Sequence, residues 1–448
     1  MQGQMTPREA VDDMLAGANL TAAPASGVYS FAVRRALSSS EVTRSENSGA
    51  STAACGRTQK STHLAAAVPL AARLCLCLCG FLSNAESQVL RRDWRALDET
   101  SGDAAIERAG IPRRLIAIDN RCAWPNLVTL RDGTIVAIVF NQPNHGMTEG
   151  DVECWASQDG GLTWSFRSTV TRHAPNTVRM NVAAGLNREG ELIVLCSGWD
   201  NIAPQRGRQS RPLETVGLFS SDNGATWEQG GKLPPPVDGL SHHVPFGDIV
   251  IAQNGDLVAG TYVFDATWES RGKGRNRRGE VYALRSSDGG RTWGEAAVIA
   301  DTNHVEAAIL HLGRGRWLSA SRRFGDLDLD LHASDDDARS WHHVKTLGIP
   351  RVSAAHLLQL SDGRVLLAYG NRSPGNYGLD VRLGSDEGKA WSAPQRLINF
   401  ESRDNGYPET VQLSDGRLLI AYYAHHARQH GRYHMGILNL STDELHPE

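Results

Sequence analysis

Side chains suited to proton transfer and nucleophilic attack recur at one position of a phrase that this 448-residue chain repeats. The phrase is an apolar run, a short turn containing glycine and a second apolar run, and its six copies begin at Trp124, Met180, His242, His304, Val352 and Gly406. Carboxylates and histidines exchange protons near neutral pH, and a tyrosine can attack a carbon atom. The reactive residues that open the copies, with neighbours that could bind a ligand, are Trp124, Asn126, Arg179, Asn181, His242, His243, His304, Glu306, His356, Tyr407 and Glu409.

A second set of polar residues lies in the connections that leave the second apolar run of a copy. If the copies are equivalent units around one axis, both sets converge at one end of that axis. A single histidine in such a place is often only structural, so the prediction depends on the whole set. The connections supply Asn141, Gln142, Asn144, His145, Glu149 and Asp151 after the first copy, Arg322 and Arg323 after the fourth, and Asn371 and Arg372 after the fifth.

An eight-residue motif follows most of the copies and predicts how they are built. Three versions fit the pattern Ser-x-Asp-x-Gly-x-Thr-Trp, at 157–164, 220–227 and 286–293, and two degraded versions lie at 334–341 and 384–391. The aspartate can accept hydrogen bonds from backbone N–H groups of its own turn, glycine allows a positive φ, and the tryptophan packs between units. We interpret Asp159, Asp222 and Asp288 as structural residues of hairpin corners.

The repeats predict an all-β fold, a six-bladed β-propeller. Each copy and its motif account for four short strands, and six such units form a closed ring. The sixth unit has no motif, so the early strand 113–119 is expected to complete the last blade and cover its edge. No helical periodicity of useful length follows residue 110.

The N-terminal quarter of the chain has a different composition from the repeats. Residues 1–60 are rich in small and polar residues and are expected to be disordered, or to be an extension that precedes the true start. Residues 61–85 contain an apolar run that ends in small residues, as in a secretory signal peptide. Residues 86–110 would be a linker and 111–442 the propeller. Because the run after Arg73 is too short to span a bilayer, we expect a secreted, periplasmic or extracellular protein without stable membrane insertion.

Charge and cysteine content exclude several classes of partner and cofactor. The net charge of −4 does not suit nucleic-acid binding. Only Cys122, Cys154 and Cys196 of the seven cysteines fall in the propeller, so we expect buried free thiols and no disulfide framework. No local motif for a metal or cofactor is present, although a divalent ion held by the clustered histidines remains an alternative. We expect a monomer that binds a glycan.

The motifs and the six units resemble the sialidase-like propellers, whose Asp-boxes are corners of this kind. The resemblance covers the whole propeller. It implies that Tyr407, which opens the last innermost strand, is the nucleophile, and that Glu149 or Asp151 is the acid/base residue. Three arginines of that family bind the carboxylate of the substrate; Arg372 lies in the right connection for one, and Arg179, Arg322 and Arg323 are available for the others.

The chain also departs from the pattern of that family. Residues 123–126 replace the aromatic-Arg-Ile-Pro signature, with Trp124 in place of the arginine, and a second arginine is replaced near Gln142. The glutamate that pairs with the tyrosine is expected near the start of the fifth copy, where residues 351–356 contain none. Glu409, Glu306 and His356 are the candidates to take the proton of Tyr407.

Three functions agree with these observations. The first is a secreted exo-acting glycoside hydrolase resembling exo-α-sialidases. The second is a glycosidase or lyase for polysaccharides that contain uronate or rhamnose, with histidines as acid/base groups. The third is a glycan-binding propeller without activity. For the first, the candidate catalytic residues are Tyr407, Glu149, Asp151, Glu306 and Glu409, and the candidate substrate-binding residues are Trp124, Asn126, Gln142, His145, Arg179, Asn181, His242, His243, His304, Arg322, His356 and Arg372.

Overall fold

The computed structural model describes residues 21–25, 28–32 and 111–446, except 201, 203–209, 237–238, 265–278, 326, 350 and 428–429. The chain divides into two units, Met1–Ala72 and Arg73–Glu448. In the first unit, β1 (Thr21–Ala25) and β2 (Val28–Ala32) form an antiparallel hairpin, and the rest of residues 1–60, for which disorder was expected, lies outside the described residues. The predicted signal peptide and linker lie outside the described residues.

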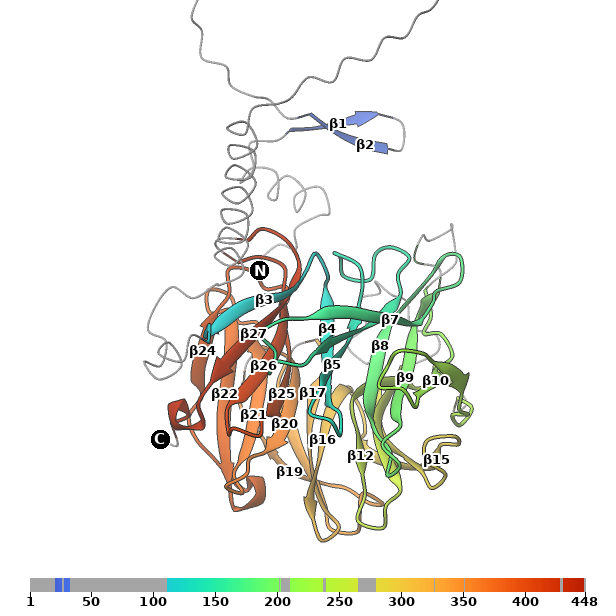
Figure 1. Cartoon of the computed structure of the whole chain (residues 1–448), viewed down its shortest axis with the longest axis vertical. Helices are drawn as coiled ribbons and strands as arrows, with labels where there is room; N and C mark the ends of the chain where they lie inside the picture. Colours follow the sequence, from blue (N-terminus) through green and yellow to red (C-terminus); the bar gives the residue numbers. More distant parts are fainter. Residues whose placement is uncertain are drawn as a thin grey trace, which may run out of the picture. The chain divides into compact units, whose positions relative to one another are not determined.

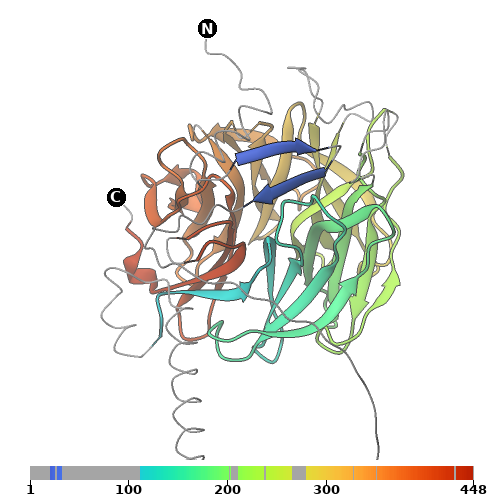
Figure 2. The ribbon, with the colours of Figure 1, turned by 90° about the horizontal axis from the view of Figure 1, so that it is seen from above.

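The second unit is a propeller-like arrangement of β-sheets (Figures 1 and 2). Four sheets are separate blades of four or five strands. The first is β4 (Ala123–Thr129), β5 (Ile135–Phe140), β6 (Val152–Ser157) and β7 (Ser165–Thr171). The second is β16 (His304–Gly313), β17 (Arg316–Arg323), β18 (Leu329–Ser334) and β19 (His342–Thr346). The third is β20 (Val352–Gln359), β21 (Val365–Asn371), β22 (Gly378–Ser385), β23 (Ala390–Trp391) and β24 (Gln395–Asn399), and the fourth is β25 (Asn405–Gln412), β26 (Leu418–Ala424), β27 (His434–Leu440) and β3 (Arg114–Asp119).

The remaining strands form one eight-stranded sheet, which corrects the prediction of six separate four-stranded blades. Its strands are β8 (Thr177–Leu186), β9 (Leu192–Asp200), β10 (Val216–Ser220), β11 (Glu228–Gly230), β12 (Val244–Ile251), β13 (Leu257–Phe264), β14 (Gly279–Ser286) and β15 (Gly294–Ala300). Two antiparallel halves are joined by a parallel pairing of β8 with β12. Gly185 permits this close approach, because a Cβ there would lie 2.2 Å from the carbonyl oxygen of Ile249.

Strand β3 closes the last blade, as the sequence predicted. It pairs antiparallel with β27, so residues 114–119 lie beside the strand that ends the repeats. Arg114 donates a hydrogen bond from Nε to the Tyr422 hydroxyl at 2.6 Å, which links β3 to β26. Among the described residues, no helix is both long and apolar enough to cross a membrane.

The middle strands of the blades are buried on both faces. In β5, Val136 and Ile138 pack toward the neighbouring β8–β11 half-sheet, whereas Ile135, Ala137 and Val139 pack toward the blade that β3 completes. Successive side chains of a strand point to opposite faces, so a blade between two others needs an uninterrupted apolar run. The propeller cysteines Cys122, Cys154 and Cys196 are buried free thiols, as expected.

The Asp-boxes form the predicted corners. Asp222 Oδ1 accepts hydrogen bonds from the backbone N–H of Ala225 and Thr226 and from the Ser220 hydroxyl, and its Oδ2 accepts one from the Thr226 hydroxyl at 2.6 Å. These hydrogen bonds lower the pKa of Asp222 to about 2, and the bond from the Thr226 hydroxyl has the largest effect. Asp159 and Asp288 have the same arrangement.

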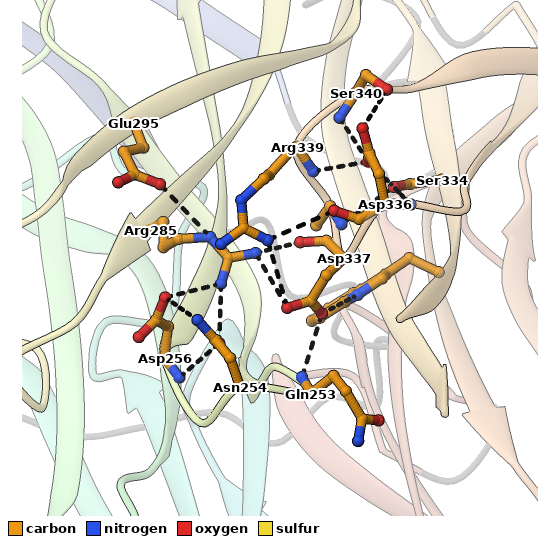
Figure 3. A network of polar contacts seen from close by, with 12 residues as sticks. Gln253, Asn254, Asp256, Arg285, Glu295, Ser334, Asp336, Asp337, Arg339 and Ser340 are labelled. Atoms are coloured by element: carbon orange, nitrogen blue, oxygen red, sulfur yellow. Dashed lines mark hydrogen bonds and ion pairs between the residues drawn. The ribbon is translucent and has the colours of Figure 1, made fainter. Parts of the chain in front are cut away.

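The degraded box at 334–341 keeps this corner and joins it to the next sheet (Figure 3). Asp336 takes the place of the box aspartate. Its neighbour Asp337 lies 3.6 Å from the guanidinium of Arg285, which also binds Asp256 at 3.0 Å. Arg285 is buried and comes from β14, so ion pairs fix the contact between two neighbouring sheets.

Candidate active site

The first strands of the six units line the centre of the propeller, and each has an irregular register near its start. Neighbouring first strands contact one another, for instance β25 with β4 and β16 with β20. The register shifts fall at Ala123/Asn126, Arg179/Asn181, Pro245/Ile249, Val305/Ala307, Val352/Ala355 and Gly406/Glu409. Within three of them, Trp124, Glu306 and Tyr407 have φ values of 43°, 45° and 48°. A bulge redirects the side chain it carries, and such backbone strain concentrates at functional sites.

Tyr407 and Glu306 come together across the ring from these bulges. The Tyr407 hydroxyl donates a hydrogen bond to Glu306 Oε1 at 2.7 Å. Arg322 Nη2 lies 2.5 Å from the other oxygen of the same carboxylate. Burial, and then the charge of Glu306, raises the pKa of Tyr407 far above its ordinary value, so the phenol is neutral. The arrangement suits a phenol that attacks an electrophilic carbon while the carboxylate takes its proton.

The guanidinium of Arg372 lies over the ring of Tyr407. Its guanidinium carbon lies 5.7 Å from the centre of the Tyr407 ring, and Nη2 donates to the Tyr423 hydroxyl at 2.9 Å. Tyr423 in turn donates to Asp404 at 2.7 Å. Burial acts to raise the pKa of Asp404, but hydrogen bonds from His145, Tyr433 and Tyr423 outweigh it and hold the pKa well below its usual range.

The Trp124 ring packs beside Tyr407. The two ring centres are 6.3 Å apart, and the indole stacks on Phe140 at 5.3 Å. His145 meets the indole edge-on at 4.7 Å, and its Nδ1 lies 3.2 Å from Asp404 Oδ1. Trp124 is 9% exposed, and its Nε1 has no hydrogen-bond partner within the described part of the chain. A buried N–H without a partner is costly unless a ligand accepts from it.

Glu149 and Asp151 both contact His173, which was not among the candidate residues. His173 Nδ1 lies 2.7 Å from Asp151 Oδ1, and its Nε2 lies 3.4 Å from Glu149 Oε2. His173 was missed because it follows an Asp-box strand, where the repeat gives no signal for chemistry. The segment that carries the two acids pairs with β8 through Gly150 and Val178, and Val178 packs in the same cluster as Trp124 and Tyr407.

Comparison with known proteins identifies the family. A model of the BNR repeat-like domain matches residues 133–420, more than half of the chain. The chain belongs to this family. The chain is 24% identical to a sialidase of Bacteroides fragilis over 363 residues, and the matched region is 73% of this chain and 64% of that relative. It is 22% identical to a sialidase of Clostridium perfringens over 296 residues, which are 63% of this chain and 72% of that one.

Solved structures share the fold of this BNR repeat-like protein. A protein of unknown function from Dyadobacter fermentans superposes with a TM-score of 0.62 at 20% identity, over 73% of this chain and 98% of that chain. A Hadza microbial sialidase gives a TM-score of 0.58 at 17% identity, over 72% of this chain and 66% of that chain. The sialidase of Trypanosoma rangeli in complex with sialic acid gives a TM-score of 0.53 at 17% identity, over 71% of this chain and 54% of that chain.

The BNR repeat-like domain brings together only part of the predicted site. Near Tyr407 it gathers Glu306, Arg322, Arg372, Trp124 and His145. The glutamate that binds the tyrosine is thus Glu306 of the fourth copy, and its expected place in the fifth copy was wrong. Asp404, Tyr423 and Tyr433 were not among the candidates, because they flank the repeated position without occupying it.

Other candidates are engaged within or between blades. His243 bonds to the Thr261 hydroxyl at 2.9 Å, and burial lowers its pKa to about 4. His304 Nε2 lies 2.8 Å from Asp330 of its own blade. Arg179 donates to the carbonyls of Cys196 and Glu214, and Asn181 lies 3.4 Å from the Tyr262 hydroxyl. Gln142 donates to Asn141, and Arg323 lies 3.8 Å from Asp330. His242 lines a pocket with Leu240 and Phe264.

Glu409 and His356 form a second cluster with Asp248. His356 Nε2 lies 3.1 Å from Asp248 Oδ2 and 3.2 Å from Glu409 Oε1, and Asn126 donates to the carbonyl of the adjacent Gly247 at 2.7 Å. These three groups could in principle hold a metal ion. However, the Thr410 N–H donates to His356 Nδ1 at 3.2 Å, whereas a metal-binding histidine normally donates from its second nitrogen. The geometry therefore fits a carboxyl group and a carboxylate that share a proton.

Proposed function

We propose that this chain is an exo-acting glycoside hydrolase that removes a terminal sugar from glycans, with Tyr407 as nucleophile. The observation that carries the proposal is the 2.7 Å hydrogen bond from the Tyr407 hydroxyl to Glu306. Tyr407 attacks the anomeric carbon, its proton passes to Glu306, and the glycosidic oxygen leaves with a proton from an acid at Glu149 or Asp151. Water then attacks the anomeric carbon and gives one proton to the acid at Glu149 or Asp151, while the Tyr407 oxygen leaves and regains its proton from Glu306.

The substrate proposed first is a sialoside. Support comes from the similarity to sialidases and from Arg322 and Arg372 on either side of Tyr407. In the same proposal, the eight-stranded sheet counts as two blades of a six-fold ring, and the protein is a secreted monomer.

The test is a comparison of the purified full chain with Tyr407→Phe on aryl sialosides, uronosides and rhamnosides. We expect turnover of one class and a loss of roughly 10³-fold or more in kcat for Tyr407→Phe, because the nucleophile is removed. Tyr369→Phe, at a buried tyrosine of β21, is the matched control and should remain active. Wild-type activity that survives in Tyr407→Phe would contradict the proposal.

A second candidate is a glycosidase or lyase for uronate- or rhamnose-containing polysaccharide with histidine as the acid/base group. The observation that favours it is His173, which a carboxylate orients as in enzymes with a histidine base. Turnover of a uronoside or rhamnoside that depends on His173 and not on Tyr407 would identify this alternative.

A further inference from the structure

Glu149 and Asp151 lie two residues apart but have different surroundings. The Asp151 side chain is 14% exposed, and its Oδ1 accepts the backbone N–H of His173 at 2.8 Å and faces His173 Nδ1 at 2.7 Å. Glu149 is 50% exposed, and its Oε1 accepts the backbone N–H of Asn176. Asp151 is therefore occupied within the protein, whereas Glu149 is accessible to a bound ligand.

The contacts of His173 fix which of its nitrogens carries a proton. Asp151 Oδ1 faces Nδ1, so the proton of a neutral ring lies on Nδ1, where it is donated to this carboxylate. Nε2 is then free to exchange a proton with Glu149 Oε2, 3.4 Å away. The order Asp151–His173–Glu149 places an oriented imidazole behind the exposed carboxyl group.

We infer that Glu149 is the acid/base residue of the proposed hydrolysis and that His173 is its positioning residue. This inference rests on the proposed function. As the glycosidic bond breaks, the proton on Glu149 moves to the leaving oxygen while Tyr407 bonds to the anomeric carbon. In the second step Glu149 takes a proton from the attacking water, so Glu149 ends as it began. His173 holds the Glu149 carboxyl group toward the substrate and shares its proton between Nε2 and Oε2.

Variants of His173 separate this role from a role in folding. In His173→Asn the amide N–H₂ can still donate to Asp151 but cannot reach Glu149. The measurement is kcat/KM on two glycosides of the same sugar. One has a 4-nitrophenyl leaving group, which departs without protonation. The other has an alkyl leaving group, which must be protonated as it departs. We expect the alkyl glycoside to lose about 10²-fold and the nitrophenyl glycoside less than about 3-fold, with Glu149→Gln showing the same pattern more strongly.

The control is His426→Asn, which removes a comparable histidine–glutamate pair, His426 with Glu401 at 2.9 Å. It should leave both rates unchanged. Equal losses on the two glycosides in His173→Asn, or no loss on either, would overturn the inference. A leaving-group effect in Asp151→Asn that is absent in Glu149→Gln would also overturn it and assign the acid to Asp151. Failure of the proposed function itself would be separate, since Tyr407→Phe would then be active on both glycosides.

Discussion

At the scale of single residues, Glu306 combines two contacts that define its role. One oxygen of Glu306 accepts a hydrogen bond from the Tyr407 hydroxyl, and the other forms an ion pair with the guanidinium of Arg322. The guanidinium of Arg322 fixes the Glu306 carboxyl group in place, while the tyrosine beside it remains neutral because burial raises its pKa. A neutral nucleophile with a carboxyl group beside it can pass its proton to that group during the reaction without prior loss of a proton to water.

Glu306→Gln tests this reading. The amide preserves the size of the side chain and can still bind Tyr407, but it cannot take the proton. We therefore expect kcat to fall by about 10²- to 10⁴-fold with KM changed much less. Steady-state kinetics on the best substrate, with circular dichroism as a check of folding, provide the measurement. A fall in kcat/KM caused by KM alone would show that Glu306 binds substrate and does not act as a base.

The sequence located the tyrosine and the first-blade acids, and it offered Glu306 only as one of three candidates to take the proton of Tyr407. Tyr407 is found from its place in a repeat, and this position is local information. The partnership with Glu306 depends on bulges in two separate blades, and strand pairing alone determines where a bulge falls. His173 and Asp404 are side chains that fold beside the site from other positions of the repeat.

At the scale of elements, the Asp-box is a corner that its own sequence specifies. The hydrogen bonds that Asp222 accepts come from groups between Ser220 and Thr226, so the corner needs no distant partner to form. This explains why the boxes were predictable in detail. The pairing of β8 with β12 was not, because it depends on two strands about sixty residues apart and on a glycine at their contact.

Asp222→Ala should destabilise the protein without loss of chemistry. The change removes the acceptor of two backbone N–H groups and two hydroxyls, which corresponds to about 1–2 kcal/mol. Urea unfolding gives the free energy, and turnover per folded molecule should equal that of the wild type. Ser221→Ala is a control in the same corner, since the Ser221 side chain is exposed and the hydrogen bonds of the box are made by Ser220, Asp222 and Thr226. A stable Asp222→Ala protein without turnover would assign the box a catalytic role.

At the scale of the whole molecule, the centre of the ring contains ionisable groups from distant strands. Asp248, His356 and Glu409 come from β12, β20 and β25, so their contacts report on closure of the ring. Since the Thr410 N–H occupies Nδ1 of His356, the ring can donate from Nε2 to only one carboxylate oxygen at a time. Burial acts to lower the pKa of His356, but the charges of Glu409 and Asp248 outweigh it and raise the pKa to about 10. The hydrogen bond that Nδ1 accepts from the Thr410 N–H nevertheless requires Nδ1 without a proton, which leaves the extra proton of the cluster on a carboxyl group.

Glu409 is the group that keeps it. Burial raises the pKa of Glu409 to about 8 from an unfolded value of about 4.3; the charge of His356 opposes this shift and the carboxylate of Asp248 adds to it. The folded state therefore binds a proton that the unfolded chain releases between these values. The stabilising contribution is complete below about pH 4.3 and is lost as the pH rises toward and through 8, with a slope of at most about 1.4 kcal/mol per pH unit.

Glu409→Gln should flatten this dependence, because the amide mimics the protonated carboxyl group at every pH. We expect the free energy of unfolding of the wild type to fall relative to that of Glu409→Gln between pH 5 and about 8. Urea titrations at several pH values measure the difference, and Glu401→Gln, at a half-exposed glutamate, serves as the control. If the two proteins lost stability in parallel across this range, Glu409 would be ionised in the folded state. The balancing charge would then have to be a proton on His356, which requires the Thr410 N–H to turn away from Nδ1, and backbone amide exchange at Thr410 would report that change.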